Sequence, residues 1–143
     1  QRQWMFGGIE RGTKRCFMLL VDRRDAATLL PIIQQYILPG TTIHSDLWRA
    51  YGGIANLPGG YQHLTVNHSM NFVDPITGSH TQSIENTWGR FKKKIKKSHG
   101  LTVANNDRYT DYLQEFMWRQ VFSNRSQILF NFWSQVATKY PCQ

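Results

Sequence analysis

The sequence is poor in cysteine and has no long apolar run. Two cysteines, Cys16 and Cys142, occur in 143 residues, and neither has a metal-ligating neighbour at close spacing. This usage is typical of a reducing compartment and argues against a disulfide framework or a zinc ribbon. No run of 18 apolar residues occurs, which argues against a membrane-spanning helix. The first residues also lack a signal peptide and an initiator methionine, so we expect a piece of a longer, intracellular protein.

Acidic residues are scarce as well. Nine Asp and Glu residues stand against 17 Lys and Arg residues, which gives a net charge of +8. Six of the eight residues from Arg90 to Lys97 are basic, so the rest of the chain carries a net charge of only +2. A local basic cluster indicates a polyanionic partner, most simply nucleic acid. From charge alone, a solvated lysine face used for solubility remains the alternative.

Apolar periodicity and turn residues predict strands and helices that form one domain over residues 1–143. Strands are expected at residues 4–10, 15–22, 41–46 and 63–69. Helices are expected at residues 25–38, 82–97, 108–120 and 125–137, with another that begins near residue 47. Loops are expected at residues 52–62 and 70–80. The apolar run "CFMLLV" predicts a strand covered on both faces.

This order of elements predicts an α/β fold with a mixed sheet. Residues 1–97 are expected to form the sheet core and the helix at 82–97. Residues 107–138 are expected to form C-terminal helices that pack on the sheet. The aromatic residues expected in the core rather than at a DNA-stacking surface are Tyr109, Tyr112, Phe116 and Trp118.

The helix expected at residues 82–97 carries an acid near its start and lysines along one flank. Its core-facing apolar stripe consists of Ile84, Trp88, Phe91 and Ile95. Glu85 lies at the rim of this stripe, in the first turn, where the helix dipole alone would favour a carboxylate. Gly89 costs about 1 kcal/mol relative to alanine and removes a side chain from the same flank. We therefore infer that a ligand approaches here, with Glu85 holding a metal ion and the lysines holding DNA.

Asp46 is the best candidate for a second carboxylate. It ends the strand expected at residues 41–46, at the edge where ligands gather in α/β sheets. Mg²⁺ is usually held by one or two carboxylates together with phosphate oxygens and water. Asp46 and Glu85 are therefore candidate metal ligands. The alternative for Asp46 is a cap on the turn that follows the strand.

Five ordered segments resemble the DDE transposase domain of insertion sequences of the ISXO-two-like type, to which the Merlin transposons of animals are related. The resemblance runs from Trp4 to about Arg119 and so covers most of the chain. The segments are "WMFGGIERGTKRCF", "TLLPII", "ILPGTTIHSDLWRAY", "HLTVNHSMNFVDPITGSHTQSIENTW" and "YLQEFMWR".

The resemblance implies a ribonuclease-H-like fold and three catalytic acids that hold two Mg²⁺ or Mn²⁺ ions in the complete site. The second acid of the family falls on Asp46, and the third falls on Glu85, 39 positions later. The first acid belongs on a strand that would precede Gln1, and Asp22 is a poor substitute for it. The resemblance therefore implies an N-terminally incomplete domain, and we expect this chain alone to be inactive.

The same resemblance implies DNA transposition. Water attacks a phosphodiester at the transposon end, and the freed 3′-hydroxyl then attacks target DNA. The residues expected to neutralise phosphates are Arg90, Lys92, Lys93, Lys96 and Lys97. Trp48 and Arg49 are further candidates for DNA contact, with core packing as the alternative for Trp48. His80 and Gln82 are candidates for orienting Glu85 or a metal-bound water, with bracing of the loop as the alternative.

The expected partners are transposon-end and target DNA, and a homodimer stays open. No membrane and no small-molecule cofactor are expected, and the location would be bacterial cytoplasm or eukaryotic nucleus. The histidines expected to be structural or at the surface are His44, His63, His68 and His99. Two other functions stay open: a non-catalytic, transposase-derived DNA-binding protein with an incomplete active site, and a plain α/β interaction module.

Overall fold

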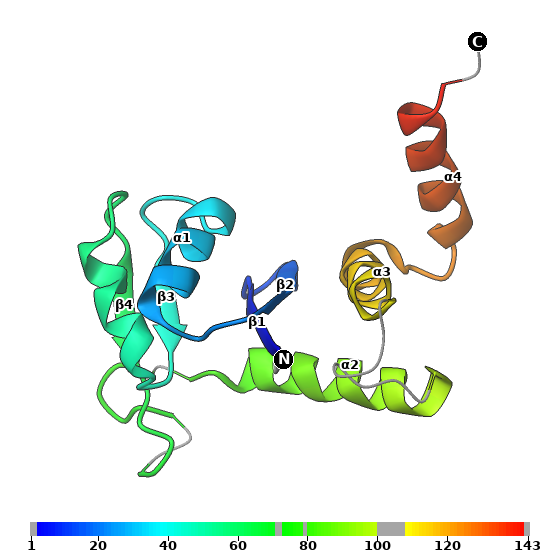
Figure 1. Ribbon diagram of the computed structural model, residues 1–143. Helices are drawn as coiled ribbons and strands as arrows, with labels where there is room; N and C mark the ends of the chain where they lie inside the picture. Colours follow the sequence, from blue (N-terminus) through cyan, green and yellow to red (C-terminus); the bar gives the residue numbers. More distant parts are fainter. Residues whose placement is uncertain (1–2, 71–72, 79, 100–107, 142–143) are drawn as a thin grey trace.

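The computed structural model describes residues 3–70, 73–78, 80–99 and 108–141, with the helical backbone alone for residues 97–99. Four strands, four α-helices and one 3₁₀ helix are found in this part of the chain (Figure 1). The α/β class expected from the sequence is therefore confirmed. Among the described helices, none combines the length and the hydropathy needed to cross a bilayer.

An antiparallel hairpin lies at the centre of the fold. Strand β1 (Trp4–Ile9) pairs with β2 (Cys16–Val21) so that Trp4 lies opposite Val21 and Ile9 opposite Cys16. The backbone N–H of Glu10 donates to the carbonyl of Arg15 at 2.8 Å and closes the turn. Gly12 and Lys14 both have positive φ angles in this turn, +92° and +62°. The predicted hairpin is thus confirmed.

The two faces of β2 enter two different hydrophobic cores. Phe17, Leu19 and Val21 belong to one core, and the alternate residues Cys16, Met18 and Leu20 belong to the other. Since successive strand residues point to opposite faces, an apolar run of six residues fills both cores. The expectation that this strand is covered on both faces is confirmed.

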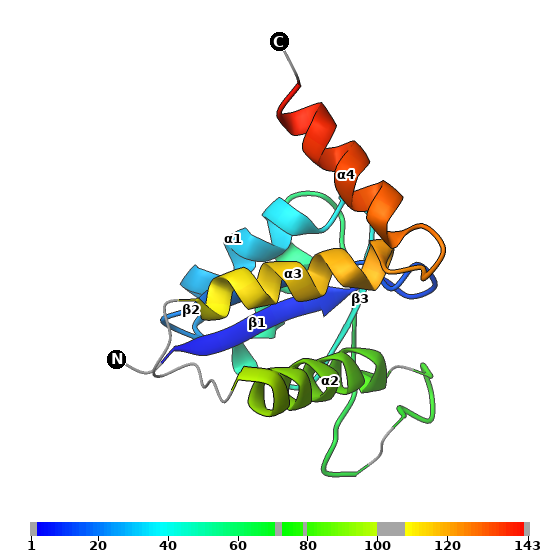
Figure 2. The ribbon, with the colours of Figure 1, turned by 90° about the vertical axis from the view of Figure 1, so that its right-hand side faces the viewer.

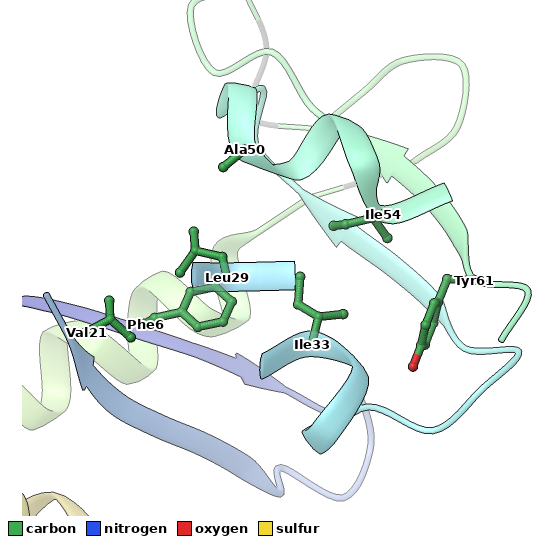
Figure 3. Packing of buried hydrophobic residues seen from close by; sticks show 7 residues of the cluster. All are labelled: Phe6, Val21, Leu29, Ile33, Ala50, Ile54 and Tyr61. Atoms are coloured by element: carbon green, nitrogen blue, oxygen red, sulfur yellow. The ribbon is translucent and has the colours of Figure 1, made fainter. Parts of the chain in front are cut away.

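The first core lies between the hairpin and helix α1 (Ala26–Tyr36). The side chains that meet there come from β1, β2, α1 and the following segment (Figure 3); they are Phe6, Val21, Leu29, Ile33, Ala50, Ile54 and Tyr61. Asp25 caps α1, because its Oδ1 accepts a hydrogen bond from the backbone N–H of Thr28 at 2.9 Å. Pro31 lies inside this helix with an exposed side chain.

The second core lies on the other face of the hairpin, against α2 (Gln82–His99) and α3 (Tyr109–Phe122). Its buried residues are Met18, Phe91, Ile95, Tyr109, Leu113 and Phe116. Phe91 meets the rings of Tyr109 and Phe116 edge to face, with centroids 5.5 and 5.2 Å apart. Trp88 packs against this core as well, so the predicted apolar stripe of α2 is confirmed at three positions, and Ile84 is half-buried.

Gly7 of β1 allows α2 to approach the hairpin closely. A Cβ atom at this position would lie 3.0 Å from Cη2 of Trp88 and 2.2 Å from the carbonyl oxygen of Phe17. Real Cβ atoms essentially never come within 3.0 Å of a backbone atom, so no larger residue fits here without movement of the strands. Glycine at position 7 thus fixes how α2 seats on β1.

A second, parallel pair of strands lies beside the first core. Strand β3 (Thr42–Ser45) pairs with β4 (Gln62–Thr65), and the 3₁₀ helix η1 (Arg49–Asn56) connects them. The described strands therefore form two two-stranded sheets, and the expected single mixed sheet is not found among them. The helix expected to begin near residue 47 is found from Arg49 as a 3₁₀ helix. Gly52 and Gly53 lower the α-helical propensity of this segment, and its 3₁₀ turns extend into the expected loop.

Helix α4 (Ile128–Lys139) projects away from both cores (Figures 1 and 2). None of its residues is buried. It is attached to α3 through Trp118, whose Nε1 donates to Oε1 of Gln135 at 2.7 Å and whose ring meets Phe132 edge to face. The expectation that both C-terminal helices pack on the sheet is thus correct for α3, which contacts β2, and wrong for α4.

Replacing Phe91 by alanine tests the second core. The side chain of Phe91 is 0% exposed. Its loss leaves a cavity between α2, α3 and the hairpin, so we expect Phe91→Ala to lower the free energy of unfolding by about 3–5 kcal/mol. Urea denaturation measures this change. Ile76→Ala is the control, because Ile76 is 93% exposed. An equal effect of the two substitutions would contradict this description of the core.

Candidate active site

Asp46 follows β3 directly and is exposed. Its Oδ1 accepts a hydrogen bond from the backbone N–H of Trp48 at 2.9 Å, which closes a local turn. This contact is the turn cap that the sequence leaves open as an alternative. A carboxylate has two oxygens, so the cap through Oδ1 leaves Oδ2 able to bind a cation.

A stack of three side chains holds the Asp46 turn against the hairpin. The guanidinium of Arg24 lies 3.7 Å from the ring centroid of Trp4 on β1 and 4.3 Å from that of Trp48. Trp48 Nε1 also donates to the carbonyl of Arg24 at 2.9 Å. One ring face of Trp48 is therefore occupied by Arg24. The stack ties the end of β3 to β1, and no sequence pattern indicates it.

A partly buried pair of hydrogen bonds supports the backbone of Asp46. Ser45 Oγ donates to the carbonyl of Asp46 at 2.8 Å and lies 2.7 Å from Nε2 of His63 on β4. Because the hydroxyl has one hydrogen and gives it to Asp46, Nε2 of His63 must carry a proton and donate to Ser45. Burial lowers the pKa of His63, which favours the neutral imidazole, and a proton on Nε2 is then the tautomer that can donate to Ser45. His63 is thus structural, as expected.

Glu85 lies in the first turn of α2 and is held by two neighbours. The Thr81 hydroxyl donates to Oε1 of Glu85 at 3.0 Å, and the backbone N–H of Glu85 donates to the carbonyl of Thr81 at 3.1 Å. His68 Nε2 lies 3.4 Å from the same Oε1 and 2.8 Å from the Thr81 hydroxyl. His68 is exposed, in keeping with the expectation of a structural or surface role, but its contact with Glu85, 17 positions further along the chain, was not predicted.

Asp46 and Glu85 line the same cavity. It has a volume of about 800 Å³ and is bounded by residues 5–10 of the hairpin, residues 41–46 of the β3 segment and the start of α2. Tyr51 lines it too, and its pKa is raised to about 12, first by burial and then by the charge of Asp46. Two acids from distant parts of the sequence therefore converge on one hollow.

Of the two residues expected to orient Glu85, His80 lines the cavity and Gln82 does not. His80 lines the cavity, its carbonyl accepts a hydrogen bond from Arg11 at 2.9 Å, and its Nδ1 is buried with no hydrogen-bond partner among the described residues. His44 also lines it, and burial, followed by the charges of Arg11 and His80, lowers the pKa of His44. Gln82 is exposed and does not line the cavity. The loop contact of His80 matches the bracing role left open for it.

The donor set in the described residues is two carboxylates. Within that part of the chain, no group of three or more His, Cys, Asp or Glu side chains is placed to hold a metal ion. Two carboxylates suit Mg²⁺ when phosphate oxygens and water complete the shell, since Mg²⁺ keeps several such ligands. The residues present therefore fit a divalent cation that is shared with a phosphate.

The basic block continues along α2 beyond the cavity. Its exposed members are Arg90, Lys92, Lys93 and Lys96. Lys94 is half-buried and lies 4.0 Å from Glu115 of α3. The side chain of Lys97 lies outside the described residues. Arg49 is exposed beside Trp48, and a Cβ atom at Gly89 would meet nothing within 4 Å. The flank between Glu85 and the lysines is therefore open.

Comparison with known proteins agrees with these observations. A protein of Haemophilus influenzae (strain Rd), named as an uncharacterized transposase-like protein, is 28% identical over 117 residues, which cover 80% of this chain and 88% of that protein. The family model of the ISXO2-like transposase domain matches residues 1–120. The chain therefore belongs to the ISXO2-like transposase domain family.

Proposed function

We propose that this domain is a DDE-type transposase that cuts DNA and joins the freed end to target DNA with the help of divalent metal ions. The observation that carries the proposal is the convergence of Asp46 and Glu85 on one cavity. Membership of a transposase family supports a role in transposition. Phosphoryl transfer of this kind needs positioned groups and neutralised charge more than covalent catalysis, and carboxylates at a cavity wall serve that need.

Asp46 and Glu85 would hold Mg²⁺ or Mn²⁺, with two ions in the complete site. When bound, such ions stabilise the attacking and the leaving oxygen of an in-line displacement. The chain's own contribution is to keep the two carboxylates in place. The turn from Trp48 and the Ser45–His63 pair hold Asp46, and Thr81 and His68 hold Glu85.

We further propose that a strand bearing the first acid inserts between β1 and β3. Among the described strands, β1 pairs with β2 alone and β3 pairs with β4 alone, so each has an edge without a strand partner. Residues of both strands line the cavity. An extended segment there would satisfy both edges and merge the two sheets into one ribonuclease-H-like mixed sheet. The domain would then place three acids around the same hollow.

The exposed basic residues of α2 are proposed to bind the DNA backbone, with Trp48 and Arg49 at the edge of the site. Lys92, Lys93 and Lys96 lie on the helix that carries Glu85 and follow it along the same element. Contacts with phosphates would position DNA without reading its sequence.

A non-catalytic DNA-binding protein derived from a transposase is the second candidate. The absence of a third carboxylate near Asp46 and Glu85 in the described part of the chain favours it. The two candidates share the basic surface and differ in whether the acids are needed.

Substituting the acids separates the candidates. In a longer protein that includes the segment before Gln1, Asp46→Ala and Glu85→Ala should each lower the rate of strand transfer by at least about 100-fold. A strand-transfer assay with Mg²⁺ or Mn²⁺ measures this rate. Asp22→Ala is the control, since Asp22 is an exposed acid just past β2. Joining at the wild-type rate by either test variant rules out the catalytic assignment, and Mg²⁺-dependent nicking by residues 1–143 alone rules out the need for a first acid upstream.

The lysines are tested by the salt dependence of duplex binding. Each lost phosphate contact should lower the slope of log K against log salt by about 0.9. We therefore expect the substitution of Lys92, Lys93 and Lys96 by alanine to flatten the plot, as measured by fluorescence anisotropy. Lys94→Ala is the matched control on the same helix, because Lys94 pairs with Glu115. Equal slopes for the triple variant and the wild type would remove these lysines from the DNA-binding surface.

Gly89→Ala tests whether DNA approaches the flank of α2. The new methyl group meets nothing within 4 Å among the described residues, so helix propensity should raise the free energy of unfolding by about 1 kcal/mol. The affinity for duplex DNA should nevertheless fall, because the methyl group lies between Glu85 and the lysines. Asn86→Ala, an exposed change on the same helix, controls for helix propensity. Unchanged affinity of the Gly89 variant would show that this flank does not contact DNA.

A further inference from the structure

Helix α4 presents a large apolar surface, and apart from the contact of Phe132 with Trp118 no described element covers it. Five large hydrophobic side chains of α4 and its C-terminal cap are 47–72% exposed: Leu129, Phe130, Phe132, Trp133 and Tyr140. We call these five the arm face. The helix stands away from both cores in two perpendicular views (Figures 1 and 2). Single exposed apolar residues are ordinary, whereas several on one helix indicate an interaction site.

The side of α4 that contacts α3 is its more polar side. Gln135 accepts a hydrogen bond from Trp118, and Asn131 Nδ2 donates to the carbonyl of Phe122 at 3.3 Å. At 100° per residue, Leu129 and Trp133 lie on the opposite side from Asn131. The helix therefore attaches through two amides and the ring contact of Phe132 with Trp118, and it directs most of its apolar surface outward, the reverse of a helix that packs on its own domain.

A helix of 12 residues is marginal in water without tertiary support. The contacts with Trp118 and Phe122 cover one side only, so the arm face needs a cover of its own. DNA is a poor cover, because α4 carries one charged residue, Lys139, and the arm face carries none. An apolar protein surface is chemically complementary to the arm face.

We propose that the arm face binds the arm face of a second copy of this chain. A two-fold axis brings the same patch of both copies together, and the five side chains carry no charge to oppose this pairing; Lys139, whose Nζ lies 5.6 Å from the ring centroid of Tyr140, is at the edge of the patch. Fully exposed aromatic side chains present roughly 150–250 Å² each, so the exposed fractions of the five residues leave roughly 600 Å² per copy. Complete burial of these side chains on both copies would remove at most roughly 1,200 Å² from water, which is the lower end of the range for specific interfaces.

The pairing does not depend on the proposed catalysis. Asp46 and Glu85 lie on the β3 segment and α2, whereas the arm face lies beyond α3. The dimer joins two domains through their C-terminal helices and leaves the cavity and the basic surface of α2 accessible on each copy. Measurements of mass without metal or DNA therefore test the dimer alone.

Sedimentation equilibrium of the 143-residue chain tests the proposal. We expect a reversible dimer, and the double variant Phe130→Glu/Trp133→Glu should raise the dissociation constant by at least about 30-fold, since two central aromatic residues are lost and charge is placed in the interface. Val73→Glu/Ile76→Glu is the matched control, because it places two glutamates on exposed apolar residues outside α4. It should dimerise like the wild type, as should Asp46→Ala.

Two results would overturn the proposal. One is a wild-type chain that stays monomeric at roughly 100 μM, which would mean that another segment or another protein covers the arm face. The other is a dimer that the double variant does not weaken, which would mean that the copies meet elsewhere. Both substituted side chains are exposed, so circular dichroism and urea unfolding of the double variant should match those of the control and confirm that it folds.

Discussion

Burial of both faces of the β1–β2 hairpin is the interaction on which the rest of the structure depends. On one face of β2, Phe17, Leu19 and Val21 pack with α1 and η1. On the other face, Cys16, Met18 and Leu20 pack with α2 and α3. A two-stranded hairpin is marginal in water and becomes stable when apolar layers cover it. Here two layers do so, and neither core would exist without the strand that both share.

The β1–β2 hairpin also determines the geometry of the candidate site. Asp46 is tied to β1 through Trp48, Arg24 and Trp4, on the side of the first core. Glu85 is carried by α2, which seats on β1 through Trp88, on the side of the second core. The two carboxylates thus come from elements that contact opposite faces of one hairpin and converge on a cavity along its edge. Ordering of β1 is therefore a condition for bringing them together.

Regular spacing in the sequence predicted the hairpin and the helix at 82–97 with its stripe at Trp88, Phe91 and Ile95, through periods of two and 3.6 residues. A strand end and a helix start made Asp46 and Glu85 candidates, the family resemblance paired them, and both residues line the cavity. The contacts that hold those acids were not predicted. Arg24 between two tryptophans and His68 beside Glu85 are single residues brought together over long sequence separations, and such pairs leave no periodic signal. The apolar residues of α4 suggested burial, yet periodicity shows only that a surface needs a cover and does not identify the cover.

Gly7 has a consequence for how this sequence can diverge. A side chain at this position would clash with the backbone of Phe17 and crowd the ring of Trp88, so the fold requires glycine here. A lineage that lost its chemistry but kept the fold would be free to replace either acid while retaining this glycine. Position 7 is therefore a marker of architecture in related chains, and its persistence beside altered acids would identify decayed copies that still fold.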